Sequence, residues 1–179
     1  FEYDPSGNLV EDGLNRLEFS YNCLNLMKTV QTTVGASKAQ FTYGSDGRKL
    51  SEKAGTGGFE YLGSLIYAYR GGTLSLAQAV TDEGTIQSAG VNYFIRDHLG
   101  SVRAVVDHTG KTVERNDYYP FGGRHENSAL SLSATNRYKF GGKESLEQVN
   151  LDMLDFGARF YDPRIARWNT QDPLAEKNN

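Results

Sequence analysis

The chain has 179 residues and a formal net charge of −3 at pH 7, from 19 Lys and Arg against 22 Asp and Glu. This balance gives no electrostatic case for a nucleic-acid partner, which needs a clustered basic face. We find no apolar run long enough for a transmembrane helix and no signal peptide at the first residues, so this segment is not expected to insert into a membrane. The 20 Gly, 11 Tyr and 9 Phe favour many short strands joined by tight turns.

An aromatic–polar–tyrosine frame recurs four times in the first third of the sequence. The copies are Phe1-Glu2-Tyr3, Phe19-Ser20-Tyr21, Phe41-Thr42-Tyr43 and Phe59-Glu60-Tyr61. The alternation has a period of two, which is typical of a β-strand with both aromatic rings on one face. We therefore expect Tyr3, Tyr21, Tyr43 and Tyr61 on the same side of one continuous sheet. The first frame begins at the first residue, so the chain reads as a piece of a longer protein.

Turn signals follow the first and third frames, at Asp4–Gly7 and Gly44–Gly47. The second copy has Asn25 where the turn glycine would stand, and the fourth keeps a glycine at Gly63. A lone hairpin is marginally stable in water, whereas stacked hairpins pair their backbones and share an apolar face. The sequence predicts an all-β fold of repeated antiparallel hairpins stacked into a curved sheet or spiral shell segment, with very little helix. An unrelated antiparallel domain rich in tyrosine is the alternative.

The remaining chain continues this pattern up to a closing motif. Further hairpin turns are expected at Arg70–Gly72, Asp82–Gly84, Asp97–Gly100 and Asp107–Gly110, an edge position at Pro120, a loop over 124–136, a strand from Tyr138, and one turn of helix within Ser145–Leu151. The motif itself, residues 157–173, contains Asp162-Pro163 and Asp172-Pro173, ten positions apart, with the only Trp between them. Polar turns between aromatic anchors indicate a plug that closes a structure built by the preceding residues.

The stretch GARFYDPRIARWNTQDPLAEK, together with Tyr93–Arg103 and Tyr118–Gly123, resembles the core segment of RHS/YD-repeat proteins, in the form common in Bacteroidetes. The resemblance implies YD-repeat hairpins over 1–92 and a core-associated segment over 93–179, as one continuous β unit. It also implies a structural shell and plug of a polymorphic-toxin-type protein, which encloses or presents a C-terminal effector. The implied partners are the rest of the shell and that toxin domain, in an exported, extracellular or cell-surface protein.

The same resemblance suggests a catalytic role for two aspartates. Some members cut themselves by aspartyl-type chemistry, with Asp162 and Asp172 as the carboxylates here and Arg159 or Arg167 orienting them. Two close carboxylates share a proton, and such a pair can activate water. This sequence departs from the family pattern because Ala166 and Ala175 stand where glycines are usual. The alternative is that both aspartates cap turns. Arg159, Arg164 and Arg167 could bind an anion, but structural ion pairs with Asp155 and Asp162 are favoured.

Two further functions stay open, an adhesion or interaction module and a self-cleaving core, so the chain could still be an enzyme. A broad exposed aromatic patch would favour adhesion, and self-association through exposed strand edges is also expected. The sequence predicts no cofactor and no metal, since Cys23 is the only cysteine and His98 is better explained as a turn residue. We expect Cys23 to be a small buried apolar side chain.

Overall fold

The computed structural model describes residues 1–125 and 136–175. Among them, thirteen strands form one sheet whose spatial order follows the sequence from β1 to β13. These strands are β1 (Glu2–Tyr3), β2 (Leu9–Asp12), β3 (Leu17–Tyr21), β4 (Met27–Thr32), β5 (Ser37–Tyr43), β6 (Lys49–Ala54), β7 (Gly57–Leu62), β8 (Leu65–Arg70), β9 (Thr73–Thr81), β10 (Gly84–Gln87), β11 (Gly90–Arg96), β12 (Val102–Asp107) and β13 (Thr112–Arg115). We call this sheet the wall. Every pairing in it is antiparallel, which confirms the predicted all-β hairpin stack.

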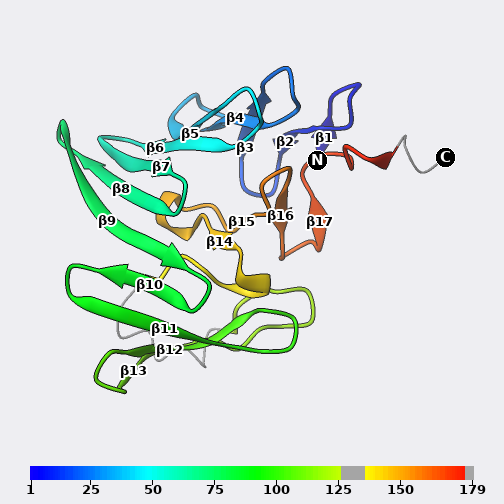
Figure 1. Ribbon diagram of the computed structural model, residues 1–179. Helices are drawn as coiled ribbons and strands as arrows, with labels where there is room; N and C mark the ends of the chain where they lie inside the picture. Colours follow the sequence, from blue (N-terminus) through cyan, green and yellow to red (C-terminus); the bar gives the residue numbers. More distant parts are fainter. Residues whose placement is uncertain (126–135, 176–179) are drawn as a thin grey trace.

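A second, four-stranded sheet lies within the curve of the wall (Figure 1). It consists of β14 (Glu144–Ser145), β15 (Leu154–Asp155), β16 (Phe160–Asp162) and β17 (Arg167–Trp168). We call residues 136–175 the plug. The described part of the chain contains no α-helix, and its helical turns are short 3-10 segments at Phe140–Gly142 and Glu147–Val149. No helix in this part is long and apolar enough to cross a membrane.

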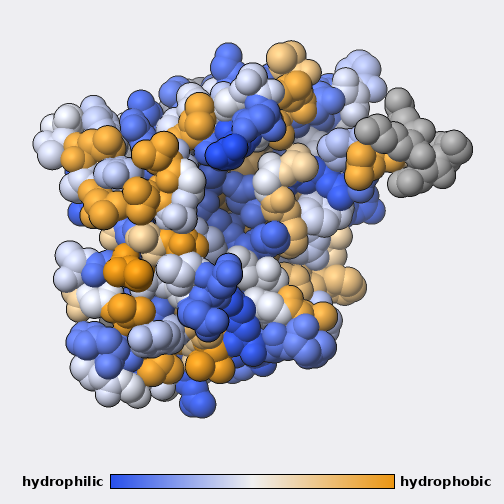
Figure 2. All heavy atoms as spheres, viewed as in Figure 1, coloured by the Kyte–Doolittle hydropathy of each residue, from blue (hydrophilic) through white to orange (hydrophobic). Residues whose placement is uncertain are grey.

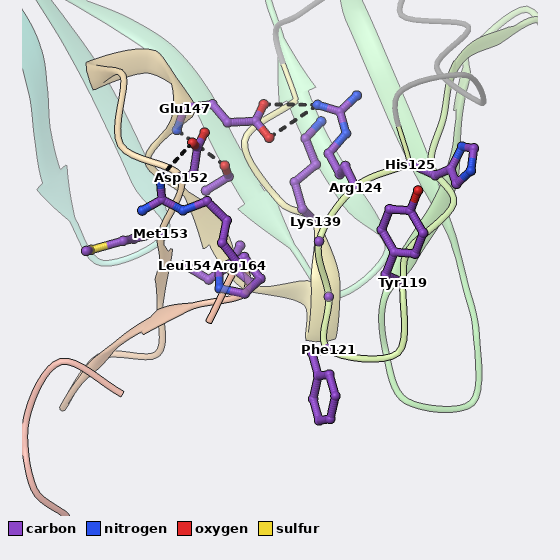
Figure 3. Close-up of a pocket in the computed structure, with 14 residues that line it drawn as sticks. Tyr119, Phe121, Arg124, His125, Lys139, Glu147, Asp152, Met153, Leu154 and Arg164 are labelled. Atoms are coloured by element: carbon purple, nitrogen blue, oxygen red, sulfur yellow. Dashed lines mark hydrogen bonds and ion pairs between the residues drawn. The ribbon is translucent and has the colours of Figure 1, made fainter. Parts of the chain in front are cut away.

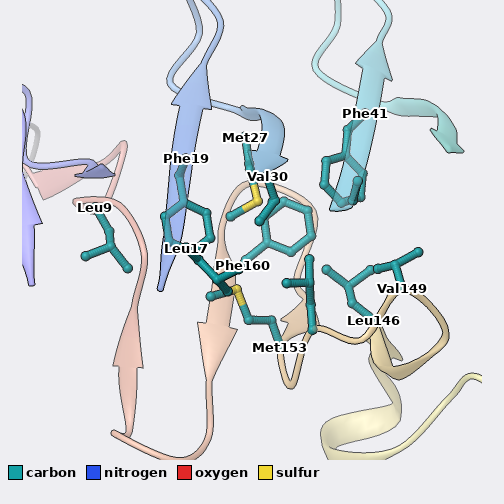
Figure 4. Packing of buried hydrophobic residues seen from close by; sticks show 12 residues of the cluster. Leu9, Leu17, Phe19, Met27, Val30, Phe41, Leu146, Val149, Met153 and Phe160 are labelled. Atoms are coloured by element: carbon teal, nitrogen blue, oxygen red, sulfur yellow. The ribbon is translucent and has the colours of Figure 1, made fainter. Parts of the chain in front are cut away.

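The main hydrophobic core joins the wall to the plug (Figure 4). Phe19, Val30 and Phe41 come from β3, β4 and β5, and each is at most 6% exposed. They pack against plug residues that include Met153 and Phe160, and the rings of Phe41 and Phe160 lie 5.4 Å apart. Burying an aromatic or large aliphatic side chain contributes roughly 1.5–3 kcal/mol, so the plug stabilises β2 to β5 of the wall.

The four repeated tyrosines lie on the concave side of the wall, as the frames predict. Tyr21 and Tyr43 pack on the main core, and the hydroxyl of Tyr61 contacts Glu144 of the plug at 3.0 Å. Tyr3 lies at the rim, where it lines a shallow groove together with Trp168 of the plug. A stacked hairpin wall therefore offers the plug a continuous aromatic surface.

The turn conformations explain why repeats with different sequences form hairpins of the same geometry. Gly7, Gly47, Gly100 and Gly110 all have φ between +76° and +88°, a region that glycine enters without strain. Asn25 occupies the equivalent place in the second hairpin with φ +57°, because asparagine tolerates the left-handed conformation better than most residues. The degenerate second repeat thus has the same turn as the others.

Three local predictions are wrong. Cys23 is exposed, because Asn22 accepts hydrogen bonds from the amides of Leu24 and Leu26 and places Cys23 at the tip of the turn. Pro120 lies in a tight turn, in which the Gly122 amide donates to the Tyr119 carbonyl, rather than at a strand edge. The strand expected from Tyr138 is reduced to one isolated bridge with Glu144.

One further local prediction is confirmed, and another concerns residues that lie mostly outside the described ranges. The expected helical turn within 145–151 is the 3-10 segment Glu147–Val149. The loop predicted over 124–136 lies mostly outside the described residues. The division proposed at 92/93 falls inside β11, so the wall runs through it without interruption.

Candidate functional site

Aspartate and asparagine side chains cap the turns of both sheets in one recurring way. The Oδ1 of Asp4 accepts hydrogen bonds from the amides of Ser6 and Asn8 at 2.9 Å, and Asp97 does the same for Leu99 and Ser101. Such a cap satisfies turn amides that no strand pairs. The two aspartates of the closing motif have to be judged against this pattern.

Asp162 ends β16 and is 5% exposed. Its Oδ1 accepts the amide of Arg164 at 2.9 Å, as in the other capped turns. The guanidinium of Arg164 also donates to both carboxylate oxygens, at 3.0 and 2.7 Å. Charge-assisted bidentate pairing of this kind is among the stronger side-chain interactions. The partner of Asp162 is therefore Arg164, one of the arginines of the closing motif that were expected to form structural ion pairs.

Asp172 lies on a more open surface, with its side chain 48% exposed. Its Oδ1 accepts the amide of Leu174 at 2.9 Å, and its Oδ2 receives a hydrogen bond from Arg159 at 2.9 Å. The guanidinium of Arg159 also lies 4.3 Å from the ring centroid of Trp168. Arg167 is exposed and lines the same shallow groove as Arg159 and Asp172.

The structure holds the two carboxylates separately. Asp162 is paired with Arg164 and Asp172 with Arg159, and no hydrogen bond joins the two aspartates in the described part of the chain. Both side chains cap turns in this arrangement. The catalytic role of Asp162 and Asp172, with Arg159 and Arg167 beside them, stays a prediction that an experiment has to decide.

A buried cluster of charged side chains crosses the interface between wall and plug. Lys49 of β6 donates to Glu144 of β14 at 2.8 Å and lies 2.6 Å from Asp155 of β15. Glu52, which is fully buried on β6, accepts from Arg137 of the plug at 2.7 Å. Two cations and three carboxylates thus connect the two sheets through a region from which water is largely excluded.

Aromatic rings complete this cluster. The guanidinium of Arg137 lies 3.9 Å from the ring centroid of Phe59, and the hydroxyl of Tyr61 donates to Glu52 at 3.1 Å and to Glu144 at 3.0 Å. Stacking over an aromatic face stabilises a desolvated guanidinium. The third and fourth repeats therefore supply both the rings and the charges that hold the plug.

These contacts determine the protonation states of Glu144 and Lys49 in the cluster. Burial alone would raise the pKa of Glu144, but the attraction of Lys49 and Arg137 outweighs it and the pKa is lowered. Burial alone would lower the pKa of Lys49, but Glu144 and Asp155 raise it well above its ordinary value. Both residues are therefore charged near neutral pH, and the plug is held by ion pairs rather than by neutral hydrogen bonds.

A cleft of about 740 Å³ separates the plug from the loop after β13 (Figure 3). Its apolar side is formed by Phe121, Met153, Leu154 and neighbouring residues. At its rim Arg124 pairs with Glu147 at 3.0 Å. In the space-filling view the hollow between the upper and lower halves of the molecule is lined largely by hydrophilic residues (Figure 2).

The charged cluster was not found in the sequence because its members are far apart along the chain. Arg137 and Glu52 are separated by 85 residues, and Glu144 and Lys49 by 95. No local motif links such positions. The one available signal was Lys49 and Glu52 on the strand that returns from the third turn, which breaks the apolar alternation of a concave face.

A curved wall of consecutive β-hairpins, closed from within by a plug of the same chain, defines a β-shell protein. The family model described as Teneurin YD-shell matches residues 1–178. The chain belongs to this family, which confirms the resemblance to RHS/YD-repeat proteins.

Known proteins with similar sequence or structure are much longer than this chain. Double-stranded DNA deaminase toxin A of Burkholderia cenocepacia is 26% identical over 217 residues, which cover 97% of this chain and 15% of the toxin. Toxin subunit YenC1 of Yersinia entomophaga is 31% identical over 85 residues, or 46% of this chain and 8% of the subunit. The Tc holotoxin pore of Photorhabdus luminescens has a similar fold, with a TM-score of 0.76 at 16% identity, over 97% of this chain and 9% of that one.

Proposed function

We propose that this chain is a wall and plug segment of a toxin-type shell, which encloses or presents a C-terminal effector. The observation that carries the proposal is the plug itself. It occupies the concave side of the wall through the core of Phe41 and Phe160 and through the ion pairs of Lys49. A segment that only presented an outer surface would not need a charged, buried attachment on its inner one.

The similar proteins also support a function in a toxin shell. Two of them are named as toxins or toxin subunits, and the solved structures with a similar fold include Tc toxin assemblies. The proposed partners are the remaining part of the shell and the effector, and the proposed location is outside the producing cell. Strand edges at β1 and β13 are where the rest of the wall would pair.

We further propose that the functional division runs between wall and plug. The wall, β1 to β13, supplies the enclosure, and residues 136–175 close it. This division is a second one beside the boundary expected at 92/93, which lies within β11.

The test uses the natural full-length protein. Its gene is read beyond Asn179, and the protein is treated with a protease that cleaves unfolded segments, with and without Phe160→Ala. We expect the C-terminal domain to be protected in the natural protein and to be cut faster in the variant, because a weakened plug opens the enclosure. Thr42→Lys, on the outer face of β5, is the matched control and should leave the protection unchanged. Equal cleavage of the C-terminal domain in all three proteins would refute the enclosure.

A further inference from the structure

A second pocket lies on the concave side of the wall, between the strands β6 to β10 and the plug. Residues of these strands line it together with Arg137, Gln148 and Val149 of the plug. We call it the inner pocket. Its volume is about 560 Å³, and pockets that hold small ligands usually measure roughly 300–1,000 Å³. The inner pocket is therefore large enough for a ligand of its own, apart from the cleft beside Phe121.

The inner pocket exists because the concave face of the wall has small side chains here. Directly paired residues of adjacent strands share a face. One row runs from Ala54 of β6 through Gly57 of β7 to Arg70 of β8, and Ala68 of β8 is paired with Phe59. On β3 to β5 the concave face has large side chains, which fill the space against the plug as the main core. Between β6 and β8 that space stays open.

Two buried side chains bring unused hydrogen-bond donors to the inner pocket. Gln78 of β9 is 5% exposed, and its Oε1 accepts from Nε2 of Gln87 at 3.1 Å, so its own Nε2 is left without a partner in the described part of the chain. Arg137 is 3% exposed. Glu52 lies 2.7 Å from its Nη2 and Glu144 2.9 Å from its Nε, whereas Nη1 has no partner among the described residues. Because proteins rarely leave buried donors unpaired, both donors indicate an acceptor in this pocket.

The charges around the inner pocket favour an anionic acceptor. None of the described residues that line it is acidic. The charge of Arg137 is already compensated by Glu52 and Glu144, which contact the other nitrogens of its guanidinium. Arg70, at the exposed rim, forms no ion pair with any described residue. Since an anion that leaves water needs a cation beside it, Arg70 supplies the charge that the buried cluster cannot.

We propose that the inner pocket binds a carboxylate on a short aliphatic stem. The carboxylate accepts hydrogen bonds from Nε2 of Gln78 and Nη1 of Arg137, and it pairs with Arg70 at the rim. Hydrogen bonds in which one group is charged are stronger than neutral ones. Ala68 and Val149 give the stem an apolar surface. A group that resembles the side chain of glutamate has both the carboxylate and the stem.

Calorimetric titration of the chain with N-acetylglutamic acid α-amide, which has one free carboxylate, tests the proposal. N-acetylglutamine α-amide is the matched neutral ligand, with the same shape and no charge. A ligand of this size binds with a dissociation constant roughly in the millimolar range. We expect the neutral ligand to bind at least tenfold more weakly, because only the acid pairs with Arg70. An acid that shows no saturable binding in this range, or that binds no more tightly than the neutral ligand, overturns the proposal.

Two substitutions locate the binding in the inner pocket. Arg70→Gln removes the charge at the rim, and Ala68→Leu fills the pocket without removing a polar group, so each should weaken the binding of the acid at least tenfold. The matched controls are Arg48→Gln, at an exposed arginine outside the pocket, and Ala79→Leu, which follows Gln78 and therefore lies on the opposite face of β9. Both controls should bind the acid as the natural chain does. Circular dichroism confirms folding, and because Arg70 is exposed its variant is informative even if Ala68→Leu does not fold. Undiminished binding in a folded Arg70→Gln or Ala68→Leu variant overturns the proposal.

The same titration of the natural full-length protein distinguishes two sources of the carboxylate. If the ligand is a free small acid, the full-length protein binds N-acetylglutamic acid α-amide as this chain does. If it is an acidic side chain of the enclosed effector, a source that rests on the proposed function, the pocket is already occupied and the added acid is excluded. Binding to this chain by itself does not require the enclosure. Failure of the carboxylate site therefore appears in the titration of this chain, whereas failure of the enclosure appears in the protease experiment.

Discussion

The hydroxyl of Tyr43 donates a hydrogen bond of 2.7 Å to the main-chain carbonyl of Met27, sixteen residues earlier. Tyr21 makes the same contact with Leu9, and Tyr118 with Val102, at 2.8 Å each. In each case the acceptor lies at or next to the start of a strand that follows a capped turn. The tyrosine hydroxyl thus links a residue just before one turn to the first residue of a strand that follows an earlier turn. This bond adds to the contribution of the ring to the concave aromatic surface.

Tyr43→Phe tests this bond separately from packing. The ring stays in place, but the Met27 carbonyl loses its donor, which costs about 1 kcal/mol of unfolding free energy. Tyr43→Ala also leaves a cavity and should cost roughly 2–4 kcal/mol. Denaturant unfolding measures both values. Tyr3→Phe is the control, because Tyr3 is 46% exposed and should show no change; a loss of similar size there would contradict the role given to the hydroxyl.

Ala166 should be a position at which glycine is better. Its φ is +54°, a left-handed conformation that costs a residue with a Cβ about 1–2 kcal/mol relative to glycine. Ala166→Gly relieves this strain but gives the unfolded chain more freedom. We expect a net gain of about 1 kcal/mol in thermal or denaturant unfolding. Ala158→Gly, at an exposed position without positive φ, should be neutral or slightly destabilising. A loss of unfolding free energy in both variants would contradict the backbone strain assigned to Ala166.

The charged cluster should make the attachment of the plug pH-dependent. Because the pKa of Glu144 is lower in the folded chain, its contribution to stability is present above the unfolded value, about 4.3, and is lost as pH falls through the folded pKa. Because the pKa of Lys49 is raised, its contribution is present below about 10.4 and is lost as pH rises through the folded pKa. Unfolding free energy should therefore be nearly flat between these limits and should fall in acid.

Glu144→Gln should flatten the acid limb of that profile. Glu147→Gln is the control, because Glu147 pairs with Arg124 at the surface, and it should keep the natural profile. Removal of a cation should have a larger effect: Lys49→Met leaves three buried carboxylates against one arginine and should cost about 3–5 kcal/mol. An unchanged acid limb in Glu144→Gln would show that other carboxylates govern acid unfolding.

The aspartates of the closing motif can be tested for catalysis. We expect a chain extended along its natural sequence beyond Asn179 to stay intact at mildly acidic pH, where a pair of carboxylates sharing a proton would be active. Asp162→Asn should then only destabilise the fold, by about 1–3 kcal/mol, because it weakens the pairing with Arg164. Mass spectrometry detects any cut. Cleavage that Asp162→Asn abolishes, in protein still folded by circular dichroism, would establish the protease instead.

The sequence predicted those parts of the fold that depend on neighbouring residues. Period-two frames predicted the strands, and Gly7, Gly47 and Gly100 predicted the turns, because these signals lie within a few residues of each other. Asn25 shows the same logic in a degenerate repeat, since the turn needs a left-handed residue rather than a glycine as such. The resemblance of the closing motif identified the family.

The contacts between wall and plug could not be predicted in this way. The pairing of Asp162 with Arg164 agrees with the expectation that the arginines of the closing motif form structural ion pairs, whereas the orienting role that the resemblance implied for Arg159 and Arg167 stays a prediction. The cluster around Lys49 was missed because its members meet only after the chain has folded back on itself. Cys23 was placed inside because free cysteines are usually buried, whereas the cap at Asn22 decides its exposure.

The central claim is that the plug and the first strands of the wall share one core, and hydrogen exchange of the chain tests it most directly. Phe160→Ala removes a plug side chain that is 2% exposed and packs on Phe41 of the wall. Its cost of about 3–5 kcal/mol should appear equally in the amides of β3 to β5 and in those of β15 and β16, because one cooperative unit opens as a whole. Loss of protection confined to the plug, with β3 to β5 exchanging as in the natural chain, would contradict the account.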